Sequence, residues 1–160
     1  MKTVPDKSVE KTWKRVTEAS PEDAQEMMDQ MARAQPFVFA YLMAVDETLN
    51  DDAERGQLLL IGLALWETLK KEAPARIIPV EEIQAAEESN LNFLQGLEAG
   101  SEMDYMDAMQ HLMASYNQMP LLGTVIEALI GGDEEVPELA HENLGLALVH
   151  LKSVIDCLDA

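Results

Sequence analysis

The chain has 160 residues, the usual length of a single domain, and a hydrophobic content of 48% that is sufficient for one buried core. Acidic residues outnumber basic residues by 30 to 11, so the net charge is −19. A negative charge of this size repels phosphate groups, which excludes nucleic-acid binding through a basic groove. The sequence also contains no apolar run of the ~18 residues that a membrane helix needs, and this excludes a membrane protein.

The cysteine content and the first residues of the chain bear on location. Cys157 is the single cysteine, so no intramolecular disulfide can form. Residues 1–19 contain basic residues but lack the apolar segment of a signal peptide. We therefore expect a cytoplasmic protein, because a reducing compartment has no need of disulfides.

Caps and prolines mark the helix boundaries, and no segment shows the period-two alternation of a strand. Ser20 and Ser101 each precede a helix with acidic residues in its first turn, whereas Pro36 and Pro120 interrupt the chain before an apolar segment. The pattern predicts an all-α bundle of seven or eight segments, with the expected helices at 8–19, 21–35, 37–49, 53–73, 80–99, 102–117, 120–130 and 137–158.

Two of these helices are apolar enough to be central, the one that contains residues 58–66 and the one that contains residues 144–149. The N-terminal helix is basic and should dock on the acidic remainder of the chain through Val9, Trp13 and Val16, which share one face. The residues that we expect to be largely buried in the core are Leu59, Leu63, Trp66, Leu144, Leu148 and Leu151.

Similar features recur in the two halves of the chain in the same order. A serine cap, a helix with methionines, a proline, an acidic turn and a Gly-Leu-Ala-Leu sequence occur in residues 20–73 and again in residues 101–158. We expect one domain over residues 1–160, built from two related three-helix units about a pseudo-two-fold axis. The helix at 80–99 would link them.

The acidic residues form a candidate surface for a positively charged partner. No lysine or arginine occurs between Arg76 and Lys152, so local bases cannot neutralise the acids of this stretch. The side chains that we expect to form the surface are Glu81, Glu82, Glu87, Glu88, Glu134 and Glu135. The same charge could serve solubility alone.

Methionines recur at helical spacing in residues 103–113. Met103 and Met106 belong to this set, together with Met109 and Met113. Such a row can fill the core between the two halves, form an adaptable groove for an apolar partner helix, or bind Cu(I). Core filling is the interpretation that the sequence favours, and no cysteine cluster supports copper.

A metal site is the alternative source of chemistry. Glu138 and His141 have the Glu-x-x-His spacing of carboxylate-bridged metal centres, and Glu134 and Glu135 lie just before them. A second such pair is missing from the sequence, as is a phosphate-binding glycine loop. Cys157 lies beside Asp156 and Asp159, which disfavour a reactive thiolate.

Taken together, these patterns predict a non-enzymatic acidic helical protein without a cofactor. It would act as an adaptor, chaperone or inhibitor that binds a basic protein surface or an apolar helix. The alternative is a metal-binding helical bundle or an enzyme that uses Glu134, Glu135, Glu138 and His141.

Overall fold

A computed structural model describes residues 1–44, 52–130 and 141–159 of the chain, with side chains of 141–143 left aside. Helices make up 82% of these residues, no strand occurs among them, and the all-α prediction is confirmed. The helices that the structure describes are α1 (Asp6–Thr17), α2 (Pro21–Ala34), α3 (Pro36–Met43), α4 (Asp52–Leu69), α5 (Val80–Ala99), α6 (Glu102–Ser115), α7 (Met119–Ile130) and α8 (His141–Leu158).

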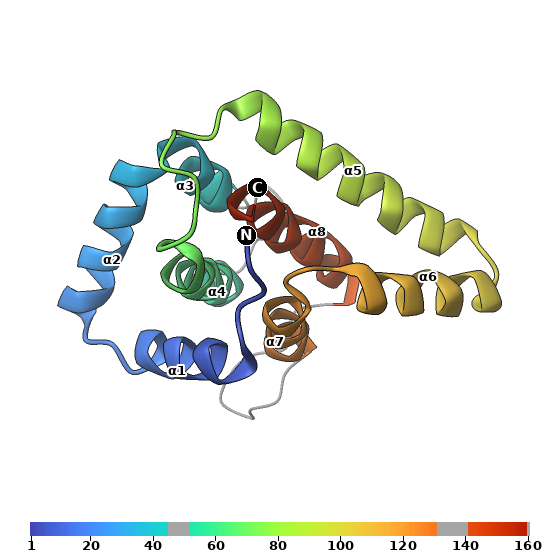
Figure 1. Cartoon of the computed structure of the whole chain (residues 1–160), viewed down its shortest axis with the longest axis horizontal. Coiled ribbons are helices and arrows are strands. Elements are labelled where there is room, and N and C mark those ends of the chain that lie inside the picture. The colour runs from blue at the N-terminus through green and yellow to red at the C-terminus, as the bar shows by residue number, and fades with distance from the viewer. Residues whose placement is uncertain (45–51, 131–140, 160) are drawn as a thin grey trace.

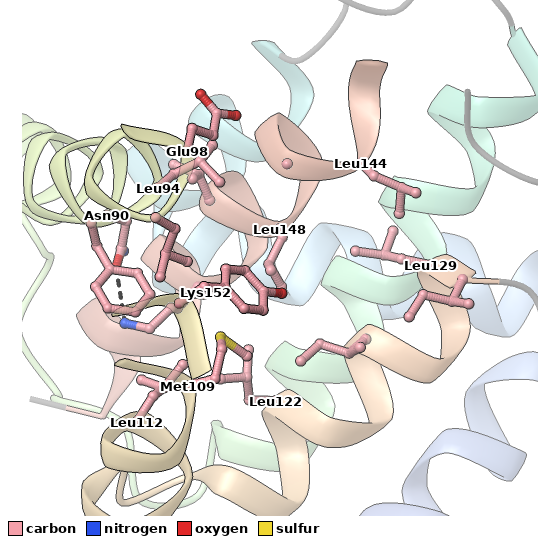
Figure 2. Close-up of a pocket in the computed structure, with 17 residues that line it drawn as sticks. Asn90, Leu94, Glu98, Met109, Leu112, Leu122, Leu129, Leu144, Leu148 and Lys152 are labelled. Carbon is pink, nitrogen blue, oxygen red and sulfur yellow. Dashed lines mark hydrogen bonds between the residues drawn. The ribbon is translucent and has the colours of Figure 1, made fainter. Parts of the chain in front are cut away.

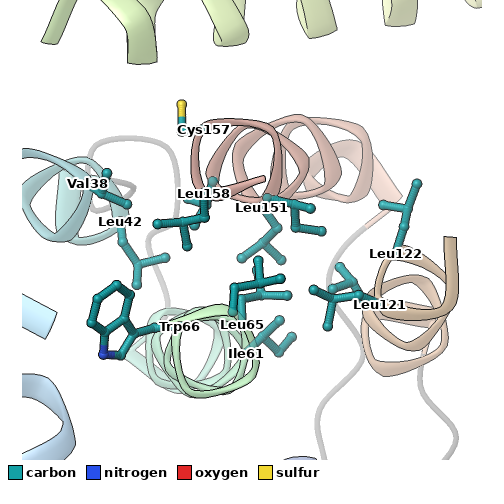
Figure 3. Close-up of a cluster of buried hydrophobic side chains, with 14 of the residues drawn as sticks. Val38, Leu42, Ile61, Leu65, Trp66, Leu121, Leu122, Leu151, Cys157 and Leu158 are labelled. Atoms are coloured by element: carbon teal, nitrogen blue, oxygen red, sulfur yellow. The ribbon is translucent and has the colours of Figure 1, made fainter. Parts of the chain in front are cut away.

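α4 and α8 lie side by side at the centre of the bundle, and the other helices surround them (Figure 1). α1, α2 and α3 pack against α4, whereas α5 and α7 pack against α8. In Figure 3, Ile61 and Leu65 of α4 point toward Leu151 of α8. Leu65 and Leu151 are completely buried, because each is covered by the opposite central helix and its neighbours.

Half of the predicted core residues are buried. The prediction is confirmed for Leu63, Trp66 and Leu151, which are at most 5% exposed. It is wrong for Leu59, Leu144 and Leu148, which are only partly buried at the edge of the main core. Leu144 and Leu148 are partly exposed because they line a cavity.

α1 docks on α4 through an apolar face and an ion pair. Val9 and Val16 are buried, whereas Trp13 is only partly buried. Arg15 contacts the Glu67 carboxylate at 2.8 Å, and Lys70 contacts the same carboxylate at 2.8 Å. The Glu67 side chain is fully buried, so these two cations compensate a charge that water does not reach.

A buried glutamine, Gln35, fixes the connection that leads into α5. Its side-chain amide donates to the carbonyl oxygens of Pro74 at 3.2 Å and Arg76 at 2.9 Å. Its carbonyl oxygen accepts from the backbone N–H of Ile78 at 2.9 Å. The segment before α5 is thereby held in an extended form against the end of α2.

A second buried glutamine, Gln118, holds the segment before α1 in the same way. Its amide donates to the Lys2 carbonyl oxygen at 3.0 Å and to Asp159 at 2.7 Å, and its carbonyl oxygen accepts from the Val4 N–H at 3.1 Å. The first residues of the chain therefore contact the beginning of α7 and the end of α8.

Both predicted serine caps are present, since Ser20 accepts from the Asp23 N–H and Ser101 from the Asp104 N–H. The packing of the capped helices differs. α2 packs against α3 and α4, whereas α6 packs mainly against α5. The internal duplication stays a prediction.

The ends of two predicted helices differ from the structure. α3 ends at Met43 and α4 ends at Leu69, earlier than the sequence suggests. Residues 45–51, in which we expect the end of one helix and an acidic turn, lie outside the described part of the chain. Over the described ranges, no helix has the length and apolar character required to cross a membrane.

His150 of α8 stacks on Tyr41 of α3, with ring centroids 4.1 Å apart. Burial lowers the pKa of His150 to about 4, although backbone hydrogen bonds to Leu42 and Tyr41 oppose this shift. The unfolded chain takes up a proton at His150 near its ordinary pKa of about 6.5, whereas the folded protein does so only near pH 4. The stability that the neutral imidazole supports is present above pH 6.5 and is lost as the pH falls through this window.

We therefore expect the free energy of unfolding to decrease by about 2 kcal/mol between pH 7 and pH 5 because of His150 alone. Urea denaturation of the wild type and of His150→Phe at both pH values measures this difference. The phenylalanine keeps the aromatic stacking but cannot titrate, so the variant should show a smaller decrease. Equal pH dependence in the two proteins would contradict the assignment.

Candidate functional site

An apolar cavity of about 390 Å³ lies between α5, α6, α7 and α8 (Figure 2). Its volume falls in the range of pockets that bind ligands. The apolar side chains that line it come from all four helices: Phe93, Leu94, Leu97, Tyr105, Met109, Leu112, Leu122, Ile126, Leu129, Ile130, Leu144, Leu148 and Val149. In Figure 2, Leu94, Met109, Leu122 and Leu148 approach the same space from four different helices.

The position of α6 leaves this cavity open. α5 continues to Ala99, and the Ser101 capping box starts α6 after a short turn. No residue of α6 is buried. α6 therefore forms one wall of the cavity without closing on α7 and α8, and Figure 1 shows it extending away from the centre together with the end of α5.

The methionines of α6 do not fill the core, so that interpretation is wrong. Met103 is 76% exposed, and Met106 and Met113 are each 55% exposed. Met109 lines the cavity. The sequence pattern identified an apolar helix face correctly, but the helix that carries it lacks a partner on that side within the described residues.

Polar groups are confined to one end of the cavity. The Asn90 amide donates to Ser153 and to Asp156, both at 3.0 Å, and the Lys152 ammonium donates to the Asn90 carbonyl oxygen and to Asp156, both at 2.9 Å. Tyr116 donates to Asp156 at 2.6 Å, and burial followed by the Asp156 charge raises the pKa of this tyrosine. Asn90 and Lys152 thus satisfy each other's hydrogen bonds inside the protein.

The sequence carries a signal for this cluster. Asn90 interrupts an apolar stripe of α5, and Lys152 is the first base after a long stretch without one. A polar residue in an apolar stripe requires a buried partner, and the partners of Asn90 all belong to α8.

Most acids of the candidate surface on α5 are accessible. Glu81, Glu82 and Glu88 are exposed, whereas Glu87 is partly buried. Arg76 contacts Glu82 at 2.8 Å, so one of these charges has a local partner that the sequence analysis missed. These acids lie in the first half of α5, and the cavity begins at Asn90 in the second half.

Glu134, Glu135 and Glu138 lie outside the described residues. His141 is the first residue of α8, and its side chain is not described. In the remainder of the chain, no three histidine, cysteine, aspartate or glutamate side chains gather as metal ligands would.

Cys157 is buried near the end of α8. Burial, followed by the negative charge of Asp156, raises the pKa of its thiol to about 11, which disfavours a nucleophilic thiolate. The cavity is therefore the candidate site with the best geometric support. Comparison with known proteins found no match among family models, curated proteins or solved structures.

Proposed function

We propose that the chain is a non-enzymatic protein that binds a positively charged partner protein through the apolar cavity and the residues around its mouth. The observation that carries the proposal is an apolar cavity that opens to solvent within a strongly acidic part of the chain. A cytoplasmic location fits the single cysteine and belongs to the same proposal.

The apolar argument rests on the mouth of the cavity. Phe93 is 38% exposed, Tyr105 45% and Ile130 61%, although all three line the cavity. Met106 and Met113 extend this apolar surface along α6. Contiguous exposed apolar surface is typical of protein-binding sites, and methionine adapts its shape to a partner.

The charge argument rests on the acids around the same helices. Glu98 lines the cavity, and four exposed acids lie on α6 and α7: Glu102, Asp104, Asp107 and Glu127. Lys152 is the cationic residue of the lining, and it is paired with Asp156. A partner with basic residues beside its apolar contact would therefore associate faster and be preferred over an acidic one.

A matched pair of variants tests the proposal. Ile130→Asp places a charge at the mouth, whereas Ile77→Asp does so at a position that is 52% exposed and does not line the cavity. Both residues are exposed, so both variants should fold, as circular dichroism can verify. Affinity capture from lysate, followed by mass spectrometry, should recover at least tenfold less of the partner with Ile130→Asp and an unchanged amount with Ile77→Asp. Equal recovery with both variants would contradict the proposal.

The acidic surface on α5 is tested separately with Glu81→Lys, Glu82→Lys and Glu88→Lys in one protein. We expect recovery of the same partner to fall and to lose much of its salt dependence, because exposed charges act within a screening length of about 8–10 Å. The helix should persist, since lysine is a good helix former. Unchanged recovery at every salt concentration would leave these glutamates without a binding role.

A further inference from the structure

The first half of the chain contains a packed cluster between α1, α2 and α4. Val16, Leu63 and Ala64 are buried there, and Met27 and Met28 of α2 pack against them. α2 thus supplies the side chains that fill the space between its neighbours. An amphipathic helix of this chain already shows how methionines can occupy such a site.

The helices around the cavity follow the same order as those around the cluster. Prolines cap α1 and α5, and buried residues follow at equal distances, namely Val9 and Val16 after Pro5, and Ile83 and Asn90 after Pro79. α2 and α6 are both 14 residues long, and each begins at a serine cap. α5–α8 therefore resemble α1–α4 in composition and order.

The two halves differ in the length of their first helix. α1 has 12 residues and α5 has 20. Eight additional residues at about 1.5 Å each carry the start of α6 about 12 Å further out. α6 consequently packs on α5 instead of closing over α8, and a cavity is present between the four helices instead of a packed cluster.

We infer that the cavity accepts an amphipathic helix of a cationic partner, which inserts methionine- or leucine-type side chains as α2 does in the first half. The inference rests on the proposed function and specifies the partner's chemistry. A helix is about 10–12 Å wide with its side chains, so only its apolar side chains would enter the cavity while its backbone lies across the mouth.

The charges of the site select this occupant over two others. A fatty acid would bring a negative charge toward Glu98 and Asp156, and a second copy of the chain would bring a charge of −19. The polar end needs no polar anchor, because Asn90 and Lys152 already bond to each other. Basic residues on the exposed face of the helix would meet the acids of α6 and α7.

The probe is a peptide of residues 19–36, which contains α2, with Glu22→Lys, Asp23→Lys, Glu26→Lys and Asp29→Lys. These changes reverse the charge of the polar face and keep the apolar face. Titration followed by fluorescence anisotropy should show saturable binding to the intact protein that weakens with added salt. A peptide that also carries Met28→Asp should bind at least tenfold more weakly, and so should the original peptide to the Ile130→Asp protein.

Methyl NMR of the methionines locates the peptide, because the chain provides its own control. The signal of Met109, which lines the cavity, should shift on binding. The signal of Met31, which is fully buried in the first half, should not. The inference is overturned if Met109 does not respond, if Met28→Asp leaves the affinity unchanged, or if the protein fills the site with a second copy or a co-purified lipid.

The two proposals can fail separately. Loss of the captured partner in Ile130→Asp, combined with no binding of the lysine-substituted peptide, would overturn the helix inference and keep the proposed function. Specific binding of the peptide, combined with equal capture by Ile130→Asp and Ile77→Asp, would support the helix inference as chemistry and contradict the proposed function.

Discussion

Replacing Leu63 with alanine is expected to lower the free energy of unfolding by about 2–5 kcal/mol. Leu63 is 2% exposed and packs in the cluster that α2 covers. The substitution removes buried apolar surface and leaves a cavity that the surrounding helices can only partly fill. Urea denaturation followed by circular dichroism measures the change.

Leu60→Ala is the matched control, because Leu60 belongs to the same helix and is 38% exposed. Its effect should stay below about 1 kcal/mol, as for most surface substitutions. A loss of less than about half a kcal/mol in Leu63→Ala would show that α2 does not seal this cluster in solution. That result would also remove the template on which the helix inference depends.

The Gln35→Ala variant should lose about 3 kcal/mol of stability. The substitution leaves the Ile78 N–H and the carbonyl oxygens of Pro74 and Arg76 without the partner that Gln35 provides. Ile78 is fully buried, so water cannot replace the lost hydrogen bond at no cost. Denaturation measures the stability, and hydrogen exchange at the Ile78 amide should become faster.

Gln95→Ala serves as the comparison, because Gln95 is exposed on α5. It should change the stability by less than about half a kcal/mol. If Gln35→Ala were equally mild, with an unchanged exchange rate at Ile78, the buried hydrogen bonds of Gln35 would not be what fixes the segment before α5.

The helices could be predicted because their boundaries depend on local chemistry. Ser20 and Ser101 cap helices through their own side chains, and Pro36 starts a new helix because its ring cannot continue the previous one. These effects act within one turn of the chain, so the residue types alone reveal them. The end of α4 at Leu69 was less predictable, since helix ends fray and lack a strong stop signal here.

The candidate site was predictable only in part, because it depends on how helices pack. The methionine pattern of α6 indicated an apolar face, but burial of Met103 and Met106 required a neighbouring helix that the length of α5 keeps away. Leu144 and Leu148 face the resulting cavity for the same reason. Sequence spacing defines which residues share a face and does not define what covers it.

Gln35 and Gln118 were not recognised as structural residues. Each is a polar residue before a proline-marked helix, a position that is usually exposed. Their partners lie between 39 and 116 residues away along the chain, so no local pattern could reveal them.

The two glutamines also make the folding of the halves interdependent. Gln35 holds the segment that introduces the second half, and Gln118 holds the segment that introduces the first. Neither segment can reach its ordered form until a distant part of the chain has assembled, which raises the contact order and delays these contacts until late in folding. The bundle should therefore unfold in one cooperative transition, and a fragment that contains either half alone should remain incompletely ordered until the other half is added.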